Sequence, residues 1–173
     1  MTLLQNKFLR LLLSTATLLG AIQIAALESD AEQEIKFQSD GGSTMRLEGE
    51  SRIWVWTENV VVTQGSLEIT GDEAILELDA ETSEMLRVTV HGSPVTYQQQ
   101  LDETGALVTG SSLTIEFYRD DVDQDLVIEL TGEAKISSPD TTMSCASITY
   151  LADRDLIRDA EGRCQGSFSP SSN

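Results

Sequence analysis

The chain has 173 residues, enough for one domain of ordinary size. Its 29 acidic residues outnumber its 11 basic ones, and the formal net charge is −18. Such a surface argues against binding nucleic acid, because proteins that do so present basic patches. It argues equally against electrostatic docking on an anionic bilayer, so we expect a soluble, self-repelling surface.

The first residues have the pattern of an export signal. Lys7 and Arg10 precede an apolar run over residues 11–27, and small residues follow. A basic start, an apolar run and a small-residue site predict a signal peptide at residues 1–26, cleaved after Ala26 or after Ala31. Cleavage after Ala26 removes the two cations, so the net charge of −18 becomes −20. An uncleaved anchor is the alternative, although the run is short for a span of about 20 residues.

Residues 27–34 are a polar lead-in, which we expect to be mobile. After it, apolar and polar residues alternate in short runs separated by turn residues, which is the pattern of half-buried strands. The first three runs cover residues 35–38, 45–48 and 51–57. The third has Trp54 and Trp56 on one face, where they either pack in the core or line a surface groove.

The stretch from Trp56 to Leu78 organises the chain. It indicates two or three short strands, with turns at Gln64-Gly65 and Gly71-Asp72. Later runs cover residues 85–90, 95–97, 113–117 and 126–130, and residues 91–94 break the first of these. Sustained helical periodicity is missing from the sequence after the export signal. We therefore predict an all-β domain over residues 35–166, followed by a disordered tail at residues 167–173.

Part of this organising stretch returns 74 residues later. The shift superimposes Val60 on Ala134, Val62 on Ile136, Ile69 on Met143, Ala74 on Ile148 and Leu76 on Tyr150. Such a return predicts a repeated supersecondary unit that uses its neighbours to build a continuous apolar interior. Chance similarity among β-rich segments is the alternative.

The sequence offers no constellation for catalysis or metal binding. His91 is the only histidine, so a Ser/His/Asp triad would require it, and no second His or Cys cluster accompanies it. The turn with Asp121, Asp123 and Asp125 opens like a calcium loop. Leu126 and Gly132 then occupy the positions where such a loop needs Gly and Glu. We therefore predict no enzyme, no cofactor and no metal site.

The two cysteines are Cys145 and Cys164. If Arg154-Asp155 forms a two-residue hairpin loop, an unbroken ladder places the cysteines directly opposite each other. An exported protein can oxidise such a pair where the geometry permits. We therefore predict a disulfide, with two free thiols as the alternative, and a bulge in the ladder would break this reasoning.

The residues ENVVVTQGSLEITGDEAILEL, from Glu58 to Leu78, resemble the most recognisable part of the OstA-like (LptA) family of lipopolysaccharide-transport proteins. The family pattern is roughly G-N-V-x-V-x-Q-G-x-x-x-I-x-A-D. The matching positions are Asn59, Val60, Val62, Gln64, Gly65, Ile69 and Asp72. Glu58 stands where glycine is usual, and Gly71 where alanine is common. Further matches follow in the same order at residues 35–40, 92–98, 131–134 and 148–150, so the resemblance covers nearly all of the chain after the export signal.

The resemblance implies a fold and a role. The fold is a twisted β-jellyroll of two antiparallel sheets, open along one side like a V. The role is transport through the periplasm without catalysis or a cofactor, with the acyl chains of the lipid A part of lipopolysaccharide in an apolar groove. Implied partners are the inner-membrane and outer-membrane components of the transport machinery. Protomers would join head to tail into a bridge that serves outer-membrane assembly.

Inward parity and position in the matching motifs give ten residues that we expect to line this groove. They are Ile35, Phe37, Val60, Val62, Leu76, Tyr97, Ile115, Phe117, Ile128 and Tyr150. For each of them, ordinary sandwich core is the alternative. Three rival interpretations of the chain stay open: a relative anchored to the inner membrane by residues 11–27, a structural β-repeat protein with a closed core, and a carbohydrate-active β-solenoid enzyme.

Overall fold

The computed structural model describes residue 30, residues 33–101 and residues 105–169. The predicted signal peptide therefore lies outside the described residues. The strands are β1 (Ile35–Gln38), β2 (Ser43–Glu48), β3 (Ser51–Gln64), β4 (Leu67–Asp79), β5 (Met85–Gln100), β6 (Leu107–Arg119), β7 (Leu126–Ser137), β8 (Thr141–Leu151), β9 (Leu156–Glu161) and β10 (Gln165–Phe168). A short 3-10 turn, η2 (Ala152–Arg154), precedes β9. In the part of the chain that the structure describes, no helix is long and apolar enough to cross a membrane.

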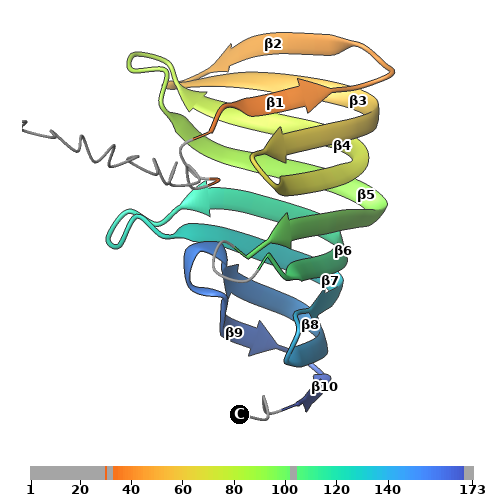
Figure 1. Cartoon of the computed structure of the whole chain (residues 1–173). Coiled ribbons are helices and arrows are strands. Elements are labelled where there is room, and N and C mark those ends of the chain that lie inside the picture. The colour runs from red at the N-terminus through yellow and green to blue at the C-terminus, as the bar shows by residue number, and fades with distance from the viewer. Residues whose placement is uncertain (1–29, 31–32, 102–104, 170–173) are drawn as a thin grey trace, which may run out of the picture.

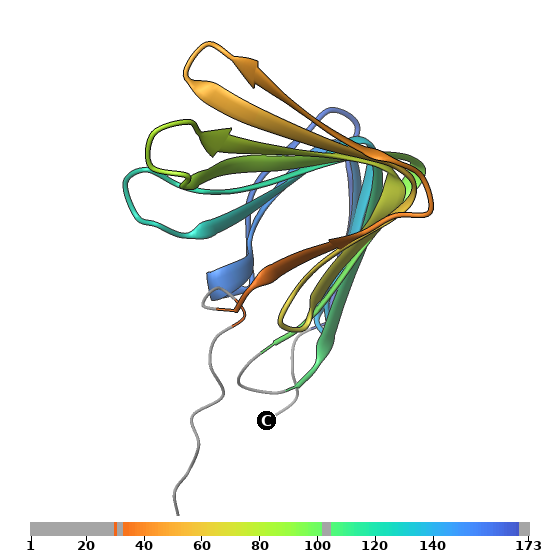
Figure 2. The ribbon, with the colours of Figure 1, turned by 90° about the horizontal axis from the view of Figure 1, so that it is seen from above.

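All ten strands belong to one antiparallel sheet, stacked in the order β1-β3-β4-β5-β6-β7-β8-β10 (Figure 1). β2 also pairs with β3, and β9 also pairs with β8. Seen along the stack, the sheet is folded into two arms that meet at one corner (Figure 2). The all-β, open, V-shaped fold is confirmed. The two predicted sheets are two walls of a single folded sheet.

The two walls are defined by which half of each long strand they contain. Wall A consists of β2, β9 and residues 51–57, 73–79, 85–91, 114–119, 126–131 and 147–151. Wall B consists of β1, β10 and residues 60–64, 67–71, 95–100, 107–112, 134–137 and 141–145. Hairpin turns join successive strands at the free tips of both walls.

The corner is made by register shifts in the middle of the long strands. β3 shifts between Thr57 and Val60, β4 between Thr70 and Glu73, and β5 between His91 and Val95. Extra residues in one strand of a pair bend it and raise its twist. The expected turn at Gly71-Asp72 and the expected break at residues 91–94 are therefore wrong. Both are bends inside continuous strands, and glycine and proline mark them as they would mark a turn.

The 74-residue repeat corresponds to two hairpins with the same register. Val62 lies opposite Ile69 in the β3–β4 hairpin, and Ile136 lies opposite Met143 in the β7–β8 hairpin. The same correspondence holds in wall A, where the pairs are Trp54 with Leu76 and Ile128 with Tyr150. The sequence similarity therefore reflects one structural unit used twice.

Residues from both segments that were expected to be flexible lie on the sheet. The tail was predicted from residue 167, but Ser167 and Phe168 pair with β8 as part of β10. The lead-in was predicted to be mobile, but Asp30 is buried and hydrogen-bonded to Ser66 in the β3–β4 turn. Backbone pairing therefore holds Ser167 and Phe168 on the sheet, and a buried carboxylate holds Asp30 there.

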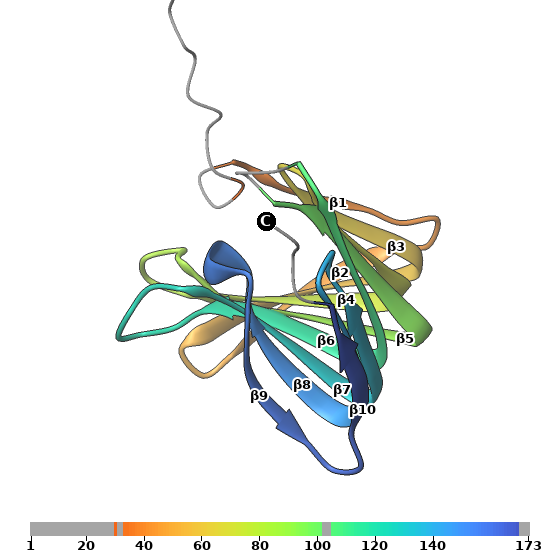
Figure 3. The same ribbon diagram turned by 60° about the horizontal axis from the view of Figure 1, so that its bottom comes forward.

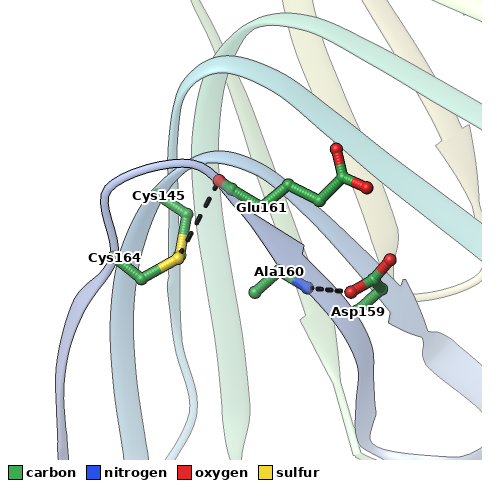
Figure 4. The surroundings of a disulfide bond; sticks show 5 residues. All are labelled: Cys145, Asp159, Ala160, Glu161 and Cys164. Carbon is green, nitrogen blue, oxygen red and sulfur yellow. Dashed lines mark hydrogen bonds between the residues drawn. A yellow bond between two sulfur atoms is a disulfide. The ribbon is translucent and has the colours of Figure 1, made fainter.

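A disulfide joins Cys145 in β8 to Cys164 between β9 and β10 (Figure 4). The ladder that leads to it is not the unbroken one assumed from the sequence. β8 and β9 meet at Leu151 and Leu156 across a four-residue turn, and the register then shifts between Thr149 and Tyr150. The register shifts by one more residue between the β8–β9 pairing and the β8–β10 pairing. Together, this shift and the one within β8–β9 bring the two cysteines opposite each other.

Candidate functional site

The ten predicted groove residues all lie between the two walls, in one apolar cluster. Seven are fully buried: Val60, Val62, Tyr97, Ile115, Phe117, Ile128 and Tyr150. The other three, Ile35, Phe37 and Leu76, are partly buried and pack against the cluster. The chain's own side chains therefore fill the interior.

The interior is built from rows of side chains that run across the strands. One row on wall A follows paired positions through the stack: Met45, Trp54, Leu76, Val88, Phe117, Ile128, Tyr150 and Ile157. A row on wall B faces it: Phe37, Val62, Ile69, Tyr97, Gly110, Ile136, Met143 and Gly166. Because side chains in a strand alternate between faces, each paired row presents one continuous apolar stripe to the opposite wall.

Aromatic rings close the interior at the end of the stack formed by β1 and β2. Phe37 of wall B stacks on Trp56 of wall A, with ring centroids 4.2 Å apart and planes 8° apart. Trp54 lies beside Trp56, with centroids 5.8 Å apart. Both tryptophans are partly buried, and Trp56 packs against the core, as the packing interpretation predicts. Trp54 packs on Trp56 at the N-terminal margin of the interior.

The end of the stack formed by β9 and β10 contains an open space instead. A cavity of about 280 Å³ lies between the walls there. Its lining is mostly apolar, with polar side chains at or beside the turns of the wall tips, and consists of Ile136, Ser138, Thr141, Met143, Tyr150, Asp155, Leu156 and Ile157. An elongated apolar group could therefore enter the interior from this end with its polar part at the rim.

Two tyrosines meet across the interior near this cavity. Tyr97 of wall B and Tyr150 of wall A contact edge to face, with ring centroids 6.4 Å apart. The Tyr97 hydroxyl donates to Gln99 Oε1 at 2.7 Å, and the Tyr150 hydroxyl donates to Asp155 Oδ1 at 2.8 Å. Burial raises the pKa of Tyr97 well above its usual value, and burial with the Asp155 hydrogen bond raises the pKa of Tyr150. Both side chains are therefore neutral in ordinary buffers.

Asp30, which precedes β1, is part of the hydrogen-bond network that includes Tyr97. Its Oδ1 accepts the Ser66 backbone N–H at 2.7 Å, and its Oδ2 accepts the Ser66 hydroxyl and the Gln99 amide, the latter at 3.0 Å. Gly65 has a φ of 60°, and a Cβ there would lie 2.0 Å from Asp30 Oδ1. Glycine is therefore required twice, for the turn and for the close approach of the carboxylate.

Sequence patterns could not have identified this polar network. Asp30 lies in a segment that is polar throughout, and Gln99 follows Gln98 in a run of three glutamines. Asp30 does not stand out by period or composition, whereas Gln99 continues the inward alternation of Val95 and Tyr97. By contrast, further interior residues such as Ile69, Leu130 and Ile148 follow the same alternation as the ten predicted ones.

The interior is apolar, and its buried polar groups are paired. Among the described residues, no group of three or more His, Cys, Asp or Glu side chains could hold a metal ion. Every buried side-chain nitrogen or oxygen in that same part of the chain has a hydrogen-bond partner. The interior thus presents apolar surface between two walls that end in polar tips.

Comparisons with known proteins agree with this geometry. The family model described as "LptA/(LptD N-terminal domain) LPS transport protein" matches residues 41–155. The chain is 31% identical to the lipopolysaccharide export system protein LptH of Pseudomonas aeruginosa over 159 residues, covering 92% of this chain and 85% of that one. It is 32% identical to LptA of Haemophilus influenzae, covering 91% and 86%.

A solved structure shows the same fold. The crystal structure of LptH from Pseudomonas aeruginosa, described as the LptA homologue of the lipopolysaccharide transport device, superimposes with a TM-score of 0.66 at 26% identity. The alignment covers 83% of this chain and all of that one. The chain therefore belongs to the LptA family of lipopolysaccharide transport proteins, which also includes the N-terminal domain of LptD.

Proposed function

We propose that the chain carries lipopolysaccharide through the periplasm, with the acyl chains of lipid A held between the two walls. The continuous apolar rows between the walls are the observation that carries this proposal. Family membership supports it, because the relatives are named lipopolysaccharide export system proteins. The role requires no reaction, so the chain acts as a carrier and not as an enzyme.

The energetics favour an apolar interior for this task. Burying one methylene contributes about 0.8 kcal/mol, so an acyl chain of about 12 methylenes gains up to about 10 kcal/mol. That gain is reduced by the cost of parting side chains that already touch. Because Phe117 and Ile128 are fully buried, the walls must separate before a chain can lie beside them. The bound state is therefore more open than the state described here.

The acidic surface requires the head group to stay outside. A net charge of −18 repels the phosphates of lipid A, and the wall tips carry many of the carboxylates. A head group in solvent, or one neutralised by divalent cations, avoids this repulsion, and the acyl chains meet only uncharged side chains inside.

Both ends of the stack offer strands for assembly into a bridge. Among the described residues, β1 and β2 pair only with β3 at one end, and β9 and β10 pair only with β8 at the other, so each has an edge without a strand partner there. All residues of β2 and β10 are exposed. A second copy could add its β1 and β2 to β10 and β9, wall to wall, by main-chain pairing. Such growth supports head-to-tail oligomers and docking to membrane components with the same fold.

The buried Asp30 favours one of the two predicted cleavage sites. Cleavage after Ala31 would remove Asp30 and the bonds it makes to Ser66 and Gln99, whereas cleavage after Ala26 keeps them. We therefore expect a mature protein that begins at Leu27. Intact-mass measurement of the protein from the periplasm tests this, and a start at Glu32 would contradict it. A retained residue 1 would instead support the anchored relative.

Photocrosslinking tests the proposed function. An aliphatic diazirine amino acid at Ile128, fully buried on wall A, changes the side-chain volume little. The matched control is the same amino acid at Leu113, which is 46% exposed. After incubation of the mature protein with lipopolysaccharide and irradiation, we expect a lipid adduct at Ile128 and only background at Leu113.

Two results would overturn the proposal. An absence of adduct at Ile128 in a protein with a native circular dichroism spectrum indicates a closed core and favours the structural β-repeat interpretation. Equal adducts at Ile128 and Leu113 indicate adsorption of lipid to the surface.

A further inference from the structure

We infer that Tyr97 and Tyr150, here called the tyrosine pair, form a gate that holds the two walls together and limits how fast an acyl chain enters the interior. This inference rests on the proposed function, and it names two residues that regulate the site. The pair joins wall B to wall A directly, since Tyr97 belongs to β5 and Tyr150 to β8.

The position of the pair is the first argument. Tyr150 lines the cavity at the β9 and β10 end. On the other side, Tyr97 lies opposite Ile69 in the filled part of the interior. The rings therefore lie between the cavity, which is already open, and the filled interior, where the walls must part before a lipid chain can enter. An acyl chain in the cavity contacts Tyr150, whose ring contacts Tyr97.

The hydroxyl groups supply the second argument. Each ring is fixed by a hydrogen bond that ends on a carboxylate at the tip of its own wall. Tyr150 reaches Asp155 directly, and Tyr97 reaches Asp30 through Gln99. A phenylalanine would fill the same space without such a bond, so the bonds fix ring orientation beyond what packing requires.

Local backbone features make room for this arrangement. Gly110 lies beside Tyr97 in the sheet, and a Cβ there would be 3.3 Å from the Tyr97 ring and 2.9 Å from Leu130. The Tyr97 ring can therefore lean over strand β6 toward wall A. Asp155 adopts a left-handed conformation with φ of 46° at the end of η2, which directs the turn to its place beside Tyr150.

The two hydrogen bonds hold the rings in the orientation in which they contact each other across the interior, and they therefore favour the closed state. When only a fraction of the molecules is open, the apparent affinity for lipid falls by that fraction. Loss of a hydroxyl releases its ring, raises the open fraction and should raise both the rate and the extent of loading. A purely structural role would lower stability and leave loading unchanged.

The test compares three single variants in the full mature protein that carries the diazirine at Ile128. Tyr97→Phe and Tyr150→Phe remove the hydroxyls of the pair. Tyr118→Phe is the matched control, because Tyr118 donates to the Glu129 carboxylate at 2.7 Å and is not part of the interior cluster. The measurement is the initial rate of adduct formation with lipopolysaccharide at saturating concentration.

We expect Tyr97→Phe to load about five-fold faster than the parent, the factor that one neutral hydrogen bond contributes. Tyr150→Phe should load at least about ten-fold faster, because its hydrogen bond ends on a charged carboxylate. The double variant should gain less than the product of the two, because the rings act as one contact. Tyr118→Phe should match the parent. If Tyr150→Phe does not fold, Asp155→Gly replaces it, since glycine accepts the left-handed conformation and removes the acceptor.

The outcomes separate the gate from the proposed function. Adducts in the parent with unchanged or slower rates in the interior variants overturn the gate and leave the transport proposal standing. Faster rates in Tyr118→Phe as well would also overturn it, because general loosening would then explain the gain. Failure of every folded variant and the parent to form adducts overturns the transport proposal, and the gate with it.

Discussion

The two ends of the stack have the same arrangement of strands but are held by different interactions. At each end, two short strands lie on opposite walls, and a connection crosses the corner between them (Figure 3). Glycine allows both crossings. A Cβ at Gly41 would lie 2.4 Å from the Thr57 carbonyl oxygen, and a Cβ at Gly162 would lie 2.5 Å from the Ala146 Cβ. Each connection therefore passes very close to the strand beneath it.

The means of closure differ in strength and reversibility. The β1–β2 end is held by hydrogen bonds, such as Asn59 Nδ2 to Asp40 Oδ2 at 2.9 Å, and by the stacking of Phe37 on Trp56. The β9–β10 end is held by the disulfide between Cys145 and Cys164. One end is thus held by noncovalent contacts, whereas the other has a covalent bond that persists until a reductant acts.

Among the changes that test this difference between the ends, removal of the disulfide should lower the free energy of unfolding the most. In the chain-entropy model, a cross-link between residues 19 apart stabilises the folded state by about 3 kcal/mol. We expect the double variant Cys145→Ser/Cys164→Ser to lose about that much free energy of unfolding in urea titrations. A dithiol reductant should reproduce the loss in the parent and have no effect on the variant. A loss below about 1 kcal/mol would show that the C-terminal end does not depend on the bond.

Truncation of the aromatic stack should give the next largest effect. Core Trp→Ala changes cost about 3–5 kcal/mol. Trp56 is only partly buried, so we expect Trp56→Ala to cost about 2 kcal/mol. Urea titration measures this, with Val55→Ala on the opposite face of the same strand as the control. An equal loss in the control would mean that the stack adds nothing specific to the N-terminal end.

The sequence was sufficient for the parts of this fold that repeat. Alternation placed Val62, Phe117 and Ile128 inside because a strand has a period of two, and each of them lies in the buried cluster. The corner could not be predicted, because the same residue types favour a bend within a strand and a turn that reverses the chain. Gly71 permits either, and only pairing with a distant strand decides between them.

Two features of the candidate site depended on long-range geometry. The predicted disulfide joins the correct two cysteines, but the ladder assumed for it was wrong. The real turn is longer than the assumed one, and two register offsets compensate for the difference. The Asp30 network could not emerge at all. Its partners Ser66 and Gln99 are distant in sequence, and no period relates them.

Alkaline titration should distinguish the two aromatic contacts that join the walls. Tyr97 and Tyr150 have raised pKa values in the folded state, because burial disfavours the phenolate. The contribution of these two tyrosines to the free energy of unfolding is fully present below the unfolded pKa of about 10. It is lost as the pH rises above that value. The contact between Phe37 and Trp56 contains no such group, so its contribution does not change with pH.

We therefore expect the free energy of unfolding to fall above pH 10 by up to about 1.4 kcal/mol per pH unit for each buried tyrosine. Urea titrations between pH 8 and pH 11 measure the slope. Tyr97→Phe/Tyr150→Phe should flatten most of it, and Tyr118→Phe should keep most of it. An unchanged slope in the double variant would place the titrating groups elsewhere.

The smallest effect should come from charge pairs at the wall tips. Arg154 contacts the Asp125 carboxylate at 2.7 Å at the β9–β10 end, and Arg46 contacts Glu48 at 2.8 Å at the other end. Arg154 is half exposed but Asp125 is mostly shielded, whereas both members of the Arg46 pair are exposed. Screening by water therefore weakens the second pair more than the first.

We expect Arg154→Gln to cost about 0.5 kcal/mol in low salt, and Arg46→Gln to cost less. Added salt should reduce both costs, because it screens exposed charges. Urea titrations at two salt concentrations measure the difference. A cost for Arg154→Gln near that of the disulfide would mean that charge pairing also holds the C-terminal end. A small cost means that the covalent bond and the buried rings set the contrast between the ends.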